Sequence, residues 1–66
     1  MKFELNGEVT EVSAPLNVRA LLERFELQQR RVAVAVNAEV VPRSRFESHE
    51  IQEGDRVEVI QAVGGG

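Results

Sequence analysis

The sequence predicts an α+β domain of two layers, in which one main helix packs on one face of a mixed sheet of four to five strands. One observation behind this prediction is a stretch of apolar residues at helical spacing, formed by Val18, Leu21, Leu22 and Phe25. The other is that segments on both sides of this stretch alternate apolar and polar residues with the period of two that strands show.

The first thirteen residues have the pattern of a β-hairpin. Phe3, Leu5 and Val9 alternate with acidic residues and threonine, and Asn6-Gly7 separates the two runs. Asn-Gly favours the positive φ angles of a two-residue type I′ turn, so residues 1–13 are predicted to form a hairpin. Pro15 then ends the strand character.

The helix is expected to run from Val18 to about Glu26, with Asn17 as the N-cap because its side-chain oxygen can accept from an unpaired first-turn amide. All four apolar residues of its periodic face are expected in the core. Residues 32–36, Val-Ala-Val-Ala-Val, form a strand that carries valines on one face and alanines on the other.

The second half of the chain alternates short strands with turns. Asn37-Ala38 leads into a short strand at 40–41, and the poor tolerance of alanine for positive φ argues against a type I′ turn there. Pro42 stops that strand, residues 43–49 form a turn or short helix anchored by Phe46, and a last strand runs from 57 to about 63. We therefore predict one domain, residues 1–63, followed by a flexible glycine tail, residues 64–66.

Composition excludes several kinds of site. The sequence has no cysteine and one histidine, so we expect no disulfide, no catalytic nucleophile of the Cys type and no metal site. The net charge of −3 argues against nucleic acid as a partner, and no apolar run approaches the roughly 20 residues of a membrane span. The expected location is the cytoplasm.

Three features together carry a family resemblance: residues 34–43, Val-Ala-Val-Asn-Ala-Glu-Val-Val-Pro-Arg, the Gly54-Asp55 turn before the last strand, and the terminal Gly65-Gly66. With this order of elements the chain resembles the ThiS family of sulfur carrier proteins, which are ubiquitin-like and have the β-grasp fold. Many relatives have glycine at the position of Ala38.

The resemblance implies a carrier rather than an enzyme, with no cofactor of its own and no catalytic residue. Gly66 would be adenylated by an E1-like, ThiF-like enzyme using ATP and magnesium, and then converted to a thiocarboxylate with sulfur from a donor such as a cysteine desulfurase. The loaded carrier would donate that sulfur to a ThiG-like thiazole synthase in thiamine biosynthesis.

The glycines suit this chemistry. A residue without Cβ passes through a narrow channel and bends freely, so Gly64 and Gly65 would give a partner enzyme access to Gly66. Ala33, Ala35, Ile60 and Ala62 are expected on the open face of the sheet as a docking surface, because ubiquitin-like proteins dock through that face. The arginines at 30–31, 43 and 45 are interpreted as solvated charges, the alternative being contact with an acidic surface on a partner enzyme.

Two other functions stay open from the sequence. A sulfur carrier for molybdopterin or for tRNA thiolation would have the same fold and tail. A ubiquitin-like interaction module that is never activated would share the fold but use its tail passively.

Overall fold

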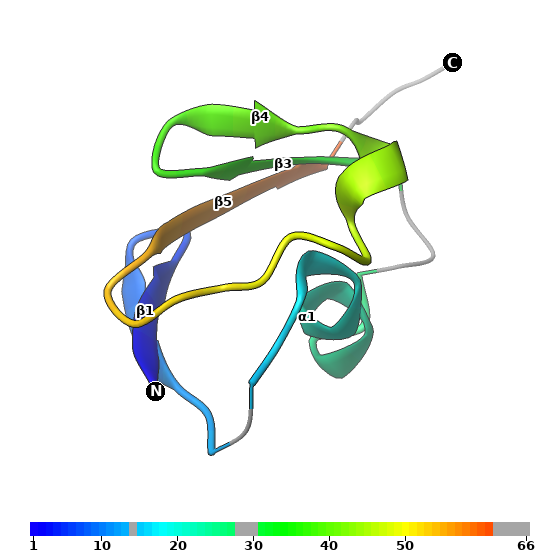
Figure 1. Ribbon diagram of the computed structural model, residues 1–66. Coiled ribbons are helices and arrows are strands. Elements are labelled where there is room, and N and C mark those ends of the chain that lie inside the picture. Colours follow the sequence, from blue (N-terminus) through cyan, green and yellow to red (C-terminus); the bar gives the residue numbers. More distant parts are fainter. Residues whose placement is uncertain (14, 28–30, 62–66) are drawn as a thin grey trace.

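A five-stranded mixed sheet with one α-helix on one face forms the body of the protein, as the sequence predicts (Figure 1). The computed structural model describes residues 1–13, 15–27 and 31–61. The elements in chain order are β1 (Lys2–Leu5), β2 (Glu8–Glu11), α1 (Val18–Arg24), β3 (Val32–Val36), β4 (Glu39–Val41), the 3₁₀ helix η1 (Arg43–Arg45) and β5 (Arg56–Gln61). Among these residues, no helix has the length and apolar character needed to cross a membrane.

The last strand, β5, lies in the centre of the sheet, whose order is β2-β1-β5-β3-β4. It runs parallel to β1 and antiparallel to β3, and the two hairpins β1–β2 and β3–β4 form the flanks. The two strands of each hairpin are close in sequence. Strand β5, in contrast, pairs with β1 from the opposite end of the chain. The sheet is therefore completed only when the last strand inserts between the hairpins.

Helix α1 covers one face of the sheet and buries the core. Val18, Leu21, Val34 and Val57 are the largest fully buried side chains. The alternation within β3 and β5 sets which valines face the helix, since the residues between them are exposed or only half-buried. The other core residues are Phe3, Val12, Leu16, Leu22, Val36, Val41, Ile51 and Val59, with Phe46 packed against them.

Both ends of α1 are set by hydrogen bonds to the backbone. Asn17 is the N-cap, as predicted, and its Oδ1 accepts from the amide of Ala20 at 2.7 Å. At the other end the amide of Glu26 donates to Glu23 and that of Leu27 to Leu22, the two bonds of a Schellman motif. This motif puts Glu26 at φ 60° and ends the helix at Arg24, two residues before the predicted end.

The prediction that Phe25 belongs to the core is wrong. Phe25 is the C-cap residue and is 37% exposed, whereas Leu21, one turn earlier, is fully buried. The helix leaves its regular path at Phe25, so the helical period no longer carries this ring onto the sheet.

The two hairpin turns have the same backbone form. Asn6 and Gly7 have φ of 51° and 85°, as predicted for a type I′ turn. Asn37 and Ala38 have φ of 52° and 70°, so the expectation that alanine would prevent such a turn is wrong. Each turn places its asparagine against β5, where Asn6 Oδ1 accepts from the Val59 amide and Asn37 Oδ1 from the Arg56 amide.

These asparagines explain why Ala38 accepts an unfavourable φ. Asn37 also donates from Nδ2 to Asp55 Oδ1 at 3.0 Å, and its own amide donates to the Arg56 carbonyl at 2.7 Å. The turn is thus held by three contacts to the segment at the start of β5, and these contacts outweigh the strain of one alanine in the left-handed region.

Replacing Ala38 with glycine is expected to stabilise the protein by about 1 kcal/mol, because glycine adopts this φ without strain. Urea unfolding followed by circular dichroism measures the change. The matched control is Ala33→Gly within β3, where the backbone is extended and glycine is expected to cost about 0.5–1 kcal/mol. A loss of stability in Ala38→Gly would contradict this account of the turn.

Candidate functional site

The open face of the sheet carries four small or apolar residues from three neighbouring strands. Ala33 of β3 is paired with Ile60 of β5, and Ala35 of β3 lies opposite Val40 of β4. Ala33, Ala35 and Ile60 thus lie on the open face next to one another, where the sequence placed them. We call these four residues, Ala33, Ala35, Val40 and Ile60, the open-face patch.

The two large members of this patch are well exposed. Ile60 is 64% exposed and Val40 is 74% exposed, while Ala35 between their strands is half-buried. Because β3 carries only alanines on this side, its backbone lies close to the surface between the two larger side chains. A partner with a flat apolar surface would bury the side chains of Ile60 and Val40 in one contact. An isolated exposed apolar residue gives a partner only one such side chain to bury.

Sequence reasoning missed Val40 as a member of the patch. The sequence does show that one of the two valines faces outward, because Val40 and the buried Val41 are neighbours in a strand and their side chains must point to opposite faces. Which of the two faces outward depends on the register of β4 against β3, which pairs Val41 with the inward-facing Val34.

Two residues of the patch, Ala33 and Ile60, lie near the end of β5, from which the chain continues to residue 66. Strand β5 ends at Gln61, whose partner is Val32, and the pair next to it is Ile60 with Ala33. Gly66 follows Gln61 by five residues, and five residues of fully extended chain span at most about 18 Å. Ala62 and the glycines at 64–66 lie outside the described residues.

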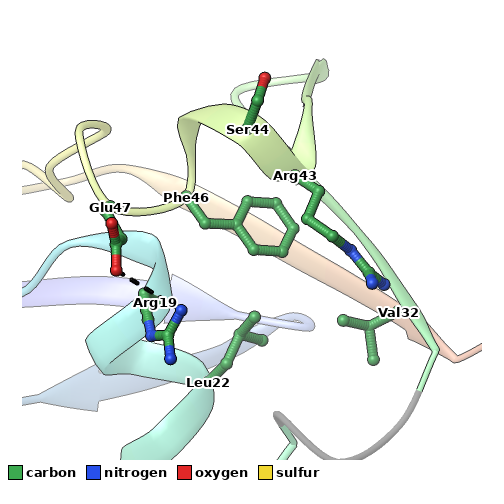
Figure 2. A pocket seen from close by; sticks show the side chains of 7 residues that line it. All are labelled: Arg19, Leu22, Val32, Arg43, Ser44, Phe46 and Glu47. Carbon is green, nitrogen blue, oxygen red and sulfur yellow. Dashed lines mark ion pairs between the residues drawn. The ribbon is translucent and has the colours of Figure 1, made fainter.

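A second feature is a hollow of about 380 Å³ between α1, η1 and the start of β3 (Figure 2). Its apolar floor comes from Leu22, Val32 and Phe46, and Figure 2 shows Arg43 reaching from η1 toward Val32. Arg19 on its rim is paired with Glu47 at 3.4 Å and with Glu23 at 3.2 Å. This hollow therefore has one arginine neutralised by carboxylates and one, Arg43, in no ion pair among the described residues.

Side chains that carry chemistry are sparse in the described part of the chain. No group of three or more His, Cys, Asp or Glu residues there is placed to hold a metal ion. No polar or charged side chain of that part is buried, and His49 contributes its backbone carbonyl to the Val18 amide. The features that stand out on the described surface are therefore the open-face patch and the charged side chains around it.

The strand order and the single helix on one face define a ubiquitin-like protein with the β-grasp fold. A crystal structure of a thiamine biosynthesis protein (ThiS) from Geobacter metallireducens superposes with a TM-score of 0.86 at 35% identity, covering 100% of both chains. The model of the ThiS family matches residues 3–66. The chain belongs to the ThiS family.

Two further relatives differ in length. The sulfur carrier protein ThiS of Escherichia coli is 32% identical over 66 residues, which is 100% of both chains. A thiazole synthase of Paramagnetospirillum magneticum is 39% identical over the same 66 residues, which are 20% of its length. In the second case a segment similar to this whole chain is part of a much longer polypeptide.

Proposed function

We propose that this protein is a sulfur carrier of thiamine biosynthesis, in which Gly66 carries the sulfur as a thiocarboxylate. The observation that supports this most directly is the full-length similarity to the sulfur carrier protein ThiS of Escherichia coli, together with the terminal glycines of this sequence. The thiazole synthase relatives favour thiamine over molybdopterin or tRNA thiolation as the pathway.

In the proposed reaction an oxygen of the Gly66 carboxylate attacks the α-phosphorus of ATP, and pyrophosphate leaves. Magnesium and ATP are bound by the E1-like enzyme. A free carboxylate resists nucleophilic attack because it is already an anion at neutral pH. The adenylate removes this obstacle, since the terminal sulfur of a persulfide on a partner can now attack the acyl carbon and displace AMP. A thiol such as free cysteine then attacks the partner's sulfur in the resulting acyl disulfide, which releases the thiocarboxylate on Gly66 and leaves a disulfide between that thiol and the partner.

The body of the carrier contributes positioning in this proposal. An enzyme that holds the open-face patch fixes the point where β5 ends, and the remaining five residues carry the acyl carbon to its active site. Ordering these residues costs roughly 1–2 kcal/mol each, which the burial of apolar side chains at the interface offsets.

The direct experiment is incubation of the purified protein with the E1-like enzyme, ATP, magnesium and a cysteine desulfurase with cysteine. The intact mass should then rise by the difference between one sulfur and one oxygen. An unchanged mass, under conditions that load a known ThiS protein, would leave the unactivated interaction module as the better explanation.

The pathway is tested separately in cells. A strain without this gene is expected to require thiamine and to grow again when the thiazole precursor is supplied. Growth that is restored only by molybdopterin, or a defect confined to thiolated tRNA, would assign the carrier to another pathway.

Changing Ile60 to aspartate is expected to lower kcat/KM for loading by about tenfold or more, because a carboxylate at the centre of an apolar interface loses its hydration. Most of the loss should be in KM. Val9→Asp is the matched control, since Val9 is 73% exposed and opposite Glu4 on the open face, but on the distant edge strand β2. Equal effects of the two variants would mean that the open-face patch is not the docking surface.

A further inference from the structure

A smaller hollow, of about 290 Å³, lies where the open-face patch meets the end of β5. Ala33 and Ile60 form its apolar side with Val32, and Arg31 and Arg43 are its charged residues. Arg31 precedes β3 directly and Arg43 is the first residue of η1, so residues twelve apart in sequence converge on one place. None of the described residues that line this hollow carries a carboxylate.

Arg31 and Arg43 are the two arginines that line this hollow, and among the described residues neither has a carboxylate partner. Arg19 is paired with Glu23 and Glu47, and Arg56 lies 3.8 Å from Glu4. Neither Arg31 nor Arg43 forms an ion pair with any residue that the structure describes. Their charge is therefore available to a partner.

Elsewhere on the open face, acidic side chains lie beside or near the basic ones. Glu58 lies opposite Ala35 on β5, and Glu4 lies next to Arg56 at the far end of the same strand. Arg31 and Arg43 thus lie where β5 finishes without a carboxylate partner among the described residues, whereas Arg56 at the other end of β5 has Glu4 beside it, and the whole chain has a net charge of −3. This uneven distribution favours one orientation of the carrier on a charged partner.

We propose that Arg31 and Arg43 form a two-arginine clamp that binds carboxylate side chains of thiazole synthase beside the apolar contact made by Ile60. The proposal rests on the proposed function. Thiazole synthase is the partner favoured because relatives with that name contain a segment similar to this entire chain within their own polypeptide. A guanidinium has two parallel donors for a carboxylate, and a partner that covers Ile60 would also shield such a pair from water.

The test is a titration of unloaded carrier with purified thiazole synthase from the same genome, followed by calorimetry at low and high salt. The variant Arg31→Glu/Arg43→Glu is expected to raise Kd about 20-fold or more and to remove most of the weakening that salt causes in the wild type. The charge-conserving variant Arg31→Lys/Arg43→Lys should bind with an intermediate Kd, because lysine lacks the bidentate geometry.

The matched control is Arg24→Glu/Arg45→Glu, which changes the net charge by the same amount at exposed positions outside this hollow. Its Kd is expected to stay within about threefold of wild type. Equal Kd values for all proteins, equal losses in both double variants, or no binding by the wild type would each overturn the clamp. Thermal unfolding of each variant excludes misfolding as the cause.

The outcome is independent of sulfur loading, because binding is measured with the unloaded chain. If the wild type binds and the clamp variants do not, the clamp stands whether or not Gly66 is activated in the loading assay. If the wild type loads but the clamp variants bind normally, the sulfur carrier function stands and the clamp is wrong.

Discussion

Deleting one glycine from the C-terminal run is expected to lower the rate of sulfur loading by at least about 100-fold. Removal of any of Gly64, Gly65 and Gly66 gives the same shortened sequence, so the deletion tests length alone. The body stays docked as before, but the acyl carbon is withdrawn by one residue, about 3.3–3.6 Å. A displacement of that size takes the carboxylate out of line with the α-phosphorus of ATP.

Intact mass measured over time gives the loading rate. Folding is expected to be unchanged, because every core residue of the described structure lies between Phe3 and Val59. Gly64→Ala is the control that preserves length, and it should load faster than the deletion. A chain extended by one glycine should also load poorly. Wild-type rates in both the shortened and the lengthened protein would contradict the positioning role of the body.

The parts of the fold that the sequence predicts are those with a local cause. Asn6-Gly7 forms the first turn because both residues accept positive φ, and Asn17 caps the helix because its side chain reaches the Ala20 amide. The alternation of valine and alanine in β3 places Ala33 and Ala35 on the open face for the same reason. Each of these features needs only neighbouring residues.

The errors occur where distant contacts decide the local structure. Ala38 has positive φ because Asn37 is bound to Asp55 and Arg56, which lie far along the chain. Glu26 has positive φ although no local signal favours it, since the chain turns there to bring Leu27 back onto the core. In both cases the tertiary contacts override the preference of a single residue.

The same distinction between local and distant causes applies to the residues of the candidate site. The place of Ala33 and Ala35 on the open face follows from local sequence, whereas Val40 requires the register of β4 and the proposed arginine clamp requires η1 to lie beside the start of β3. The role of Gly66 comes from the family resemblance and stays a prediction. The sequence alone gives no reason to connect Arg31 with Arg43. Their proximity is a consequence of the fold, because η1 brings Arg43 beside the residue that precedes β3.

Changing Leu21 to alanine is expected to destabilise the protein by about 3–5 kcal/mol, because Leu21 is 0% exposed and its neighbours on the sheet cannot close the resulting cavity. A domain of 66 residues has a total stability of roughly 3–10 kcal/mol, so this variant should be largely unfolded near 37 °C. The sequence contains no Trp or Tyr, and urea unfolding is therefore followed by circular dichroism.

Phe25→Ala is the informative comparison with Leu21→Ala, because the helical spacing predicts that both residues lie on the same buried face of the helix. Phe25 is 37% exposed at the helix end, so its truncation is expected to cost about 1–2 kcal/mol despite the larger side chain. A greater loss from Phe25→Ala than from Leu21→Ala would mean that the core extends further toward Leu27 than the structure places it. Adding Ala38→Gly to the Leu21 variant should recover about 1 kcal/mol, because no hydrogen bond among the described residues joins the turn to the helix and effects at independent sites add.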